Sequence, residues 1–131
     1  MSRPDTMRMN RGNPTIVAVV DDDDEVRDVL RGLLESVGHS VETFKSGADF
    51  LTNARLDEIA CLVVDQRMPD MSGVAVISAV ANRGLAIPSL LITGAHDAEI
   101  ARQAETLGAM TVLEKPLSSQ ELLRFVSFSV G

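Results

Sequence analysis

The chain has 131 residues, 45% of them hydrophobic, which is enough for one domain with its own core. With 19 acidic and 12 basic side chains, its formal net charge of −7 argues against non-specific binding to DNA or anionic membranes. A single cysteine, Cys61, excludes a disulfide within the chain; because it lies in an apolar run, we interpret it as a buried hydrophobic residue. Residues 1–14 contain neither a membrane span nor a signal peptide, so we expect a disordered tail before a domain over residues 15–131.

From Thr15 onward, short apolar runs alternate with segments of helical periodicity, the pattern of a parallel sheet covered on both faces. The predicted strands are Thr15–Val20, Ser40–Phe44, Ala60–Val64, Ser89–Thr93 and Met110–Glu114. The predicted helices are Asp24–Val37, Gly47–Ala54, Gly73–Arg83, Ala98–Leu107 and Ser118–Ser129, the last with Ser118 and Glu121 as a capping box. This series predicts an α/β fold, a doubly wound five-stranded parallel sheet with the flavodoxin-like order 2-1-3-4-5 and helices on both faces.

The first predicted helix begins within a run of five acidic residues, Asp21 to Glu25. Neighbouring carboxylates about 6 Å apart repel each other by on the order of 3 kcal/mol at an effective dielectric of about 20. Helix capping explains part of the run, because Asp22 and Glu25 have the spacing of a capping box and acids favour the positive end of a helix. A cap needs only one or two acids, however, so binding of a divalent cation is the second explanation. From the run alone, both stay open.

Further polar residues follow other predicted strands, and ligands of doubly wound sheets bind beyond the carboxyl ends of the strands. The residues at that edge are Asp21, Asp22, Asp65, Thr93 and Lys115. Taken singly, each has an ordinary explanation as a turn, cap or solvated residue. Together, three acids, a hydroxyl and an ammonium group are what phosphoryl transfer to a carboxylate requires. Mg²⁺ suits such a site because it binds through one or two carboxylates and phosphate.

Four sequence blocks resemble the signature of the response-regulator receiver domain: VVDD (19–22), VVDQRMPDMSG (63–73), LITG (91–94) and EKP (114–116). The resemblance extends over about residues 15–129. It implies that Asp65 is the phosphoacceptor and that Asp22, Asp65 and the backbone carbonyl of Arg67 ligate Mg²⁺. Asp21 would hold the metal through water.

The same resemblance assigns the remaining polar residues. Thr93 would be the switch hydroxyl that moves to the phosphoryl group, and Lys115 would pair with Asp65 and then with phosphate. The peptide bond before Pro116 would be cis. Asp23 and Asp24 have no ligand role in the family pattern, so we assign them to capping of the helix and to a favourable interaction with its dipole.

Two positions depart from the family, and the lesser departure is Leu117, which replaces the phenylalanine often found after Lys-Pro. Many receivers place Tyr or Phe three residues before the lysine, and Val112 stands there in this chain. Because the aromatic arm of the switch is absent, a non-phosphorylated pseudo-receiver acting as an interaction module stays open as the alternative. An aspartate-nucleophile phosphatase of the haloacid type fits less well, since Arg67 occupies the place of its second aspartate.

The partners follow from the resemblance as well. The phosphodonor would be a phosphohistidine on a sensor histidine kinase or a histidine phosphotransfer protein, in the cytoplasm, and the domain would be a signalling phosphoacceptor and not an enzyme acting on other molecules. A downstream protein, a fused output domain or a phosphorylation-dependent homodimer would carry the signal, without nucleic acid or membrane binding by this domain. We interpret His39 as a surface residue, and His96, three residues after Thr93, as a loop residue or an influence on phosphoryl hydrolysis.

Overall fold

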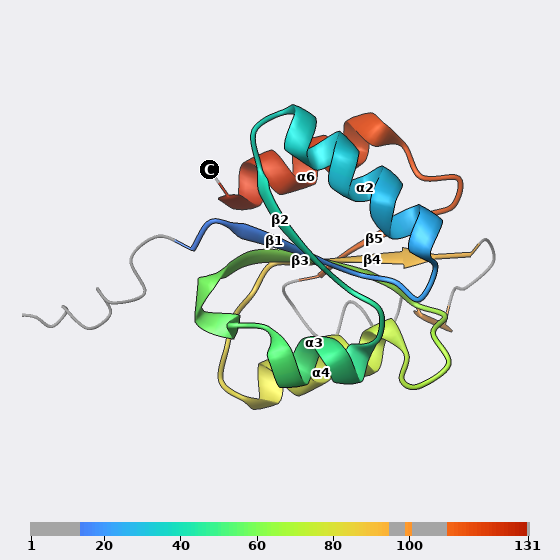
Figure 1. Cartoon of the computed structure of the whole chain (residues 1–131). Coiled ribbons are helices and arrows are strands. Elements are labelled where there is room, and N and C mark those ends of the chain that lie inside the picture. The colour runs from blue at the N-terminus through green and yellow to red at the C-terminus, as the bar shows by residue number, and fades with distance from the viewer. Residues whose placement is uncertain (1–13, 95–98, 101–109, 131) are drawn as a thin grey trace, which may run out of the picture.

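The computed structural model describes residues 14–94, 99–100 and 110–130. Within these ranges, five strands form one parallel sheet: β1 (Ile16–Val20), β2 (Ser40–Phe44), β3 (Ile59–Asp65), β4 (Ser89–Thr93) and β5 (Met110–Glu114). Their order, β2-β1-β3-β4-β5, confirms the predicted order 2-1-3-4-5 (Figure 1). Because every pairing is parallel, the carboxyl ends of all these strands lie at one edge of the sheet.

Helices cover both faces of the sheet, as predicted (Figure 1). Helices α2 (Asp24–Ser36) and α6 (Ser119–Val130) lie on one face, and α3 (Gly47–Asn53) and α4 (Gly73–Asn82) lie on the other. A short 3-10 helix, η1 (Leu56–Glu58), leads into β3. Of the predicted helix Ala98–Leu107, the structure describes Glu99 and Ile100, both helical; the rest lies outside the described residues, as do the first 13 residues of the predicted tail. The domain boundary therefore stays a prediction.

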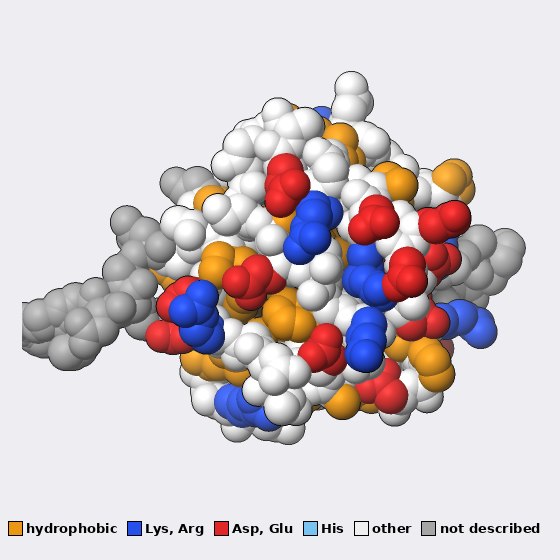
Figure 2. Space-filling model, viewed as in Figure 1, with side chains coloured by type: hydrophobic (Ala, Val, Ile, Leu, Met, Phe, Trp, Pro, Cys, Tyr) orange, Lys and Arg blue, Asp and Glu red, His pale blue; other side chains and the backbone are white. Residues whose placement is uncertain are grey.

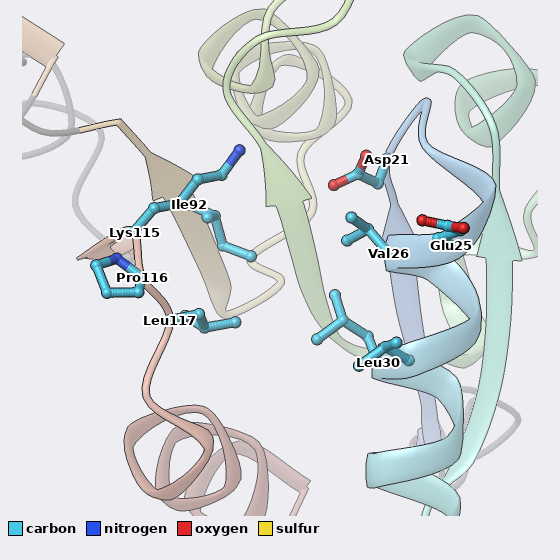
Figure 3. A pocket seen from close by; sticks show the side chains of 9 residues that line it. Asp21, Glu25, Val26, Leu30, Ile92, Lys115, Pro116 and Leu117 are labelled. Carbon is cyan, nitrogen blue, oxygen red and sulfur yellow. The ribbon is translucent and has the colours of Figure 1, made fainter.

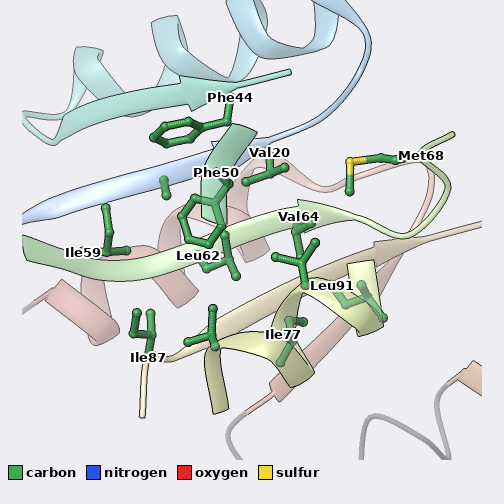
Figure 4. Packing of buried hydrophobic residues seen from close by; sticks show 13 residues of the cluster. Val20, Phe44, Phe50, Ile59, Leu62, Val64, Met68, Ile77, Ile87 and Leu91 are labelled. Carbon is green, nitrogen blue, oxygen red and sulfur yellow. The ribbon is translucent and has the colours of Figure 1, made fainter. Parts of the chain in front are cut away.

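Two apolar clusters fill the space between the sheet and its helices. Figure 4 shows the cluster on the side of α3 and α4, where the rings of Phe44 and Phe50 meet edge to face with centroids 5.3 Å apart. The other cluster joins the sheet to α2 and α6 and includes Cys61, whose burial raises the pKa of its thiol to about 12. This confirms Cys61 as a buried hydrophobic residue. Strand β3 is buried along its whole length because it is covered on both faces.

The N-terminus of α2 confirms one of the two capping predictions and corrects the other. The N-cap is Asp23, one of the two acids assigned to capping and the dipole, and not Asp22, which has the capping-box spacing with Glu25: the Asp23 backbone is extended (φ −92°, ψ 118°), and its carboxylate accepts the N–H groups of Glu25 and Val26 at 2.9 and 3.3 Å. Asp22 is exposed and lies one residue too early to reach these groups. This leaves the Asp22 carboxylate available for another partner.

The remaining ends of the helices agree more closely with the sequence. Ser118 accepts the N–H of Glu121 on its hydroxyl at 3.2 Å, so the predicted cap of the last helix is present. Helix α2 ends before Gly38, whose φ of 96° favours glycine. In the part of the chain that the structure describes, no helix is long and apolar enough to span a membrane.

Candidate functional site

Three carboxylates meet at the carboxyl edge of the sheet. Asp21 and Asp22 follow β1, and Asp65 ends β3, the strand that pairs with β1. One oxygen from each carboxylate lies within 4.8 Å of the others. Asp21 and Asp65 are each only 5% exposed, whereas Asp22 is exposed. In Figure 2, acidic side chains crowd the end of the molecule where the strands of Figure 1 terminate, with basic side chains between them.

The backbone and side chain of Asp21 are both held in place. Its N–H donates to the carbonyl of Phe44 at 3.1 Å, its Oδ1 accepts the N–H of Asp23 at 2.9 Å, and its carbonyl accepts Nη1 of Arg27 at 2.6 Å. Burial is the main cause that raises the pKa of Asp21 above its ordinary value; the hydrogen bond from Asp23 opposes it, and the charges of Asp65 and Asp22 add to it. A cation beside Asp21 would relieve this repulsion.

Asp65 has a partner for each of its carboxylate oxygens. Nζ of Lys115 lies 3.1 Å from Oδ1, and the N–H of Arg67 donates to Oδ2 at 3.2 Å. Lys115 reaches across from the end of β5, where its own N–H donates to the carbonyl of Thr93 at 2.9 Å. The Lys115–Pro116 peptide bond is cis, as the family resemblance implies. In Figure 3, the Lys115 ammonium and the Asp21 carboxylate point toward the same space beyond the strand ends.

Thr93 and Arg67 complete the predicted set, with different degrees of support. Thr93 ends β4 at the same edge and is buried, one residue beyond Ile92, the partner of Asp65 in the sheet register. Arg67 is exposed and follows Asp65 closely, and its carbonyl as a metal ligand stays a prediction. His96 lies outside the described residues. His39 precedes β2, at the opposite edge of the sheet, and is half-buried.

Gly73, at the end of the connection from β3 to α4, lies very close to the backbone of Asp65. A Cβ atom on Gly73 would lie 2.7 Å from the carbonyl oxygen of Asp65 and 2.5 Å from Cδ1 of Leu91, so only glycine fits. Gln66 closes this connection, because its carbonyl accepts the N–H of Gly73 at 3.1 Å and its side-chain oxygen accepts the N–H of Val74 at 3.0 Å. The close approach of Gly73 and the two hydrogen bonds of Gln66 thus hold the backbone after Asp65 in place.

Two contacts near the site could not be predicted from the sequence. The first is the bond from Arg27 to the Asp21 carbonyl, which helical periodicity does not reveal, although the pairing of Arg27 with Asp24 three residues earlier follows from it. Asp70 accepts the N–H of Ala48 at 3.0 Å and ties the β3–α4 connection to the start of α3. Backbone N–H groups, that of Ala48 first, lower the pKa of Asp70 below its ordinary value.

A groove opens beside the carboxylates, between α2 and the start of the segment that leads to α6 (Figure 3). Its volume is about 450 Å³. Most of its lining is apolar, and Asp21, Glu25 and Lys115 are its charged members. The apolar residues are Val26, Val29, Leu30, Ile92, Pro116 and Leu117. A partner lying in this groove would touch both the acidic cluster and the lysine that faces it.

The donor set fits a hard divalent cation. All three side chains offer carboxylate oxygens, the ligands that Mg²⁺ prefers, and no sulfur or imidazole stands among them. The exposed position of Asp22 leaves room for water and phosphate oxygens, which Mg²⁺ retains when it is bound by only a few protein groups.

Comparisons with known proteins agree on one family. Residues 17–127 match the family model described as "Response regulator receiver domain". The chain is 39% identical over 120 residues to Transcriptional regulatory protein TdiR of Thauera aromatica, covering 92% of this chain and 53% of that protein. It is 38% identical over 115 residues to Transcriptional regulatory protein FixJ of Azorhizobium caulinodans, covering 88% of this chain and 54% of that protein. The chain thus spans about half the length of the curated relatives it matches.

Solved structures show the same likeness. The structure of Response Regulator StyR has 39% identity and a TM-score of 0.81, covering 88% of this chain and 58% of that one. The crystal structure of FixJ-N has 33% identity and a TM-score of 0.78, covering 88% of this chain and 93% of that one.

Proposed function

Because the chain belongs to the response regulator receiver domain family, we propose that it accepts a phosphoryl group on Asp65 in a Mg²⁺-dependent reaction and passes the change to an output by protein contact. Receiver domains are signalling domains, and this role also accounts for the clustering of polar groups at one edge of the sheet. The phosphodonor in this proposal is a phosphohistidine on a cytoplasmic sensor kinase or phosphotransfer protein.

One observation carries the proposal: the buried Asp65 carboxylate lies between two further carboxylates and a lysine. An acid that served only a turn would not need Asp21 and Asp22 within 4.8 Å, where like charges repel. A purely structural ion pair would not need them either, since Lys115 already neutralises Asp65 at 3.1 Å. The excess negative charge is explained if a cation binds here.

The reaction is a transfer between two nucleophiles. A carboxylate oxygen of Asp65 forms a bond to phosphorus while the bond from phosphorus to the donor's imidazole nitrogen breaks. The imidazole keeps the electron pair of that bond and takes up a proton from water. Mg²⁺ held by Asp22, Asp65 and the Arg67 carbonyl, with Asp21 through water, would neutralise charge on the phosphoryl oxygens.

The other two residues act on the product. The Lys115 ammonium, which pairs with Asp65 before transfer, becomes a donor to a phosphoryl oxygen afterward. The Thr93 hydroxyl takes a second oxygen, and its movement displaces the segment that follows β4. Because Val112 is half-buried against the cluster on the α3 and α4 side and carries no ring, the change reaches the output through Thr93 and that segment.

The phosphodonor protein approaches along the groove beside α2. Its histidine has to come to Asp65, and this groove, which is largely apolar, opens next to Asp21 and Lys115. An output protein or fused output domain then responds to the phosphorylated state; the relatives TdiR and FixJ are themselves named transcriptional regulatory proteins.

The test is intact mass spectrometry after incubation with Mg²⁺ and acetyl phosphate. We expect the mass of one acid-labile phosphoryl group to be added to the wild type and to Asp57→Asn, a matched change in η1 at the opposite edge of the sheet. Asp65→Asn and chelation by EDTA should each abolish the addition. Equal labelling of Asp65→Asn and wild type would overturn the assignment, and no labelling of any protein would favour the pseudo-receiver.

A further inference from the structure

Arg27 joins two parts of the loop that carries the metal-binding carboxylates. The residue lies in the first turn of α2, and its side chain folds back over the Asp21–Asp24 segment. Nη1 donates to the carbonyl of Asp21 at 2.6 Å, and Nη2 pairs with the carboxylate of Asp24. Its own N–H donates to the carbonyl of Asp23 at 3.0 Å. One residue therefore contacts the loop at three places.

The burial of Arg27 shows which of these contacts matters. Its side chain is only 15% exposed, whereas that of Asp24 is 86% exposed. An ion pair with so exposed a partner contributes little, because water and salt screen it. The bond to the Asp21 carbonyl lies at the point where β1 leaves the sheet, just after the N–H of Asp21 donates to Phe44. Arg27 thus supplies a donor to a carbonyl beyond the end of the strand.

A positively charged side chain such as that of Arg27 is unexpected so close to a metal site. By charge alone, a guanidinium beside Asp21 and Asp22 would repel Mg²⁺ and weaken its binding. By geometry, the same group fixes the backbone from which both carboxylates project, and ordered supporting residues strengthen metal binding. The two effects have opposite signs, so a measurement separates them.

We propose that Arg27 is a positioning residue for the cation site: its largely buried guanidinium holds the Asp21–Asp24 loop in its binding shape by donating to the Asp21 carbonyl. This inference rests on the proposed function, since it assumes that Asp21 and Asp22 serve a cation. It adds a residue outside the ligand set, whose removal weakens metal binding although it removes a repelling charge.

The test compares Arg27→Lys and Arg27→Gln with Arg31→Gln. Arg31 lies one turn later on the same helix and faces Glu35 at 3.9 Å, so it controls for loss of a helical arginine. Because the chain has neither Trp nor Tyr, Mg²⁺ affinity is measured by isothermal titration calorimetry. We expect both Arg27 variants to bind Mg²⁺ about tenfold more weakly, as is usual when support for metal ligands is lost, and Arg31→Gln to bind as the wild type does.

Arg27→Lys is the decisive variant because it keeps the positive charge and replaces the rigid, planar guanidinium with a flexible ammonium group. If charge alone mattered, it would bind Mg²⁺ like the wild type, and Arg27→Gln would bind more tightly. Either result would overturn the proposal. Absence of Mg²⁺ binding by the wild type would instead refute the metal site itself, so the two failures are distinguishable.

A second readout needs no metal. Hydrogen exchange in the metal-free protein should be faster at the N–H groups of Asp21 and Asp23 in both Arg27 variants, while exchange in the middle of β3 stays as in the wild type. Acceleration throughout the sheet would show a general loss of stability and would contradict a role confined to the loop.

Discussion

Nζ of Lys115 lies 3.1 Å from Oδ1 of Asp65, and this contact joins the end of β5 to the end of β3 across the intervening strand β4. The lysine side chain is 56% exposed, so solvent screens part of the attraction. The buried carboxylate nevertheless depends on a nearby positive charge, since one oxygen each of the Asp21 and Asp22 carboxylates lies within 4.8 Å of it. In the metal-free protein, Lys115 provides that charge.

Lys115→Gln should therefore lower the free energy of unfolding of the metal-free protein by about 1 kcal/mol. Saturating Mg²⁺ should reduce this loss, because the cation supplies the positive charge that the lysine provided. Urea denaturation with and without Mg²⁺ measures both quantities. A loss of the same size in both conditions would show that Lys115 and the cation do not share a partner.

Asp22→Asn should stabilise the metal-free protein and remove the extra stability that Mg²⁺ gives. Because Asp22 is exposed, screening keeps the gain below about 1 kcal/mol. Asp28→Asn, an exposed change on α2, is the matched control and should leave the Mg²⁺ response intact. Asp24 is a poorer control because it pairs with Arg27. Thermal melts at several Mg²⁺ concentrations provide the comparison, and a midpoint of Asp22→Asn that still rises as in the wild type would contradict a ligand role.

Asp70 should make stability depend on pH in the acid range. Its pKa in the folded protein is lowered from the ordinary 3.8 by backbone N–H groups, so the ionised form favours folding. Its contribution is fully present above the unfolded pKa and is lost as the pH falls through the lower folded pKa. Asp70→Asn removes this contribution, so its stability deficit relative to wild type should shrink as the pH falls from about 6 to about 2. Urea denaturation across this range checks it, and a constant deficit would be the contrary result.

Two glycines in helices should respond in opposite ways to alanine. Gly32 lies within α2, and a Cβ atom added there would meet nothing within 4 Å, so Gly32→Ala should stabilise the protein by about 0.5–1 kcal/mol. At Gly73 the added carbon meets the Asp65 backbone, which cannot move without shifting the phosphoacceptor. Gly73→Ala should cost about 1–3 kcal/mol and slow phosphorylation. Denaturation and the mass assay test the pair, and equal stability changes would contradict the close approach.

Thr93→Ala should still accept a phosphoryl group, because the hydroxyl acts after transfer. Amide chemical-shift changes on phosphorylation of the wild type should be weak around α6, since Val112 carries no ring to move there. In Thr93→Ala they should also decrease in the segment after β4. Large changes centred on Val112 and α6 in the wild type would refute this route for the signal.

Strands β1, β3 and β4 were predictable because each is a short, mostly apolar run, and a sheet covered on both faces buries such runs. Strand β2, at the end of the strand order, is mixed, and only Val41 and Phe44 of its residues are buried. Strand β3 shows the limit of this reasoning: it begins at Ile59 and includes Asp65, a charged residue that composition alone would place in the following loop. The sequence left both Asp22 and Asp23 as candidates for the cap of α2, because several consecutive aspartates satisfy the same pattern, and only the backbone angles select Asp23.

The candidate site was predictable as a set of positions but not as a set of contacts. Parallel strands bring Asp21, Asp65, Thr93 and Lys115 to one edge whatever their side chains do, so topology alone implied their proximity. The reach of Arg27 to a carbonyl six residues earlier depends on the path of the loop, which has no periodicity. The contact of Asp70 with Ala48 joins segments 22 residues apart and depends on how α3 packs beside α4.

The direction of the strands also determines how the protein can be handled. Strand β1 begins, and helix α6 ends, at the side of the sheet away from the carboxyl edge (Figure 1). Five residues of strand separate Ile16 from Asp21, a distance of about 16 Å. A tether to a surface, or an affinity tag, attached beyond either of these ends would therefore leave the carboxyl edge of the sheet, where Asp65 lies, open to solution. Immobilised in this way, the protein could be presented to candidate phosphodonor proteins with its reactive edge unobstructed.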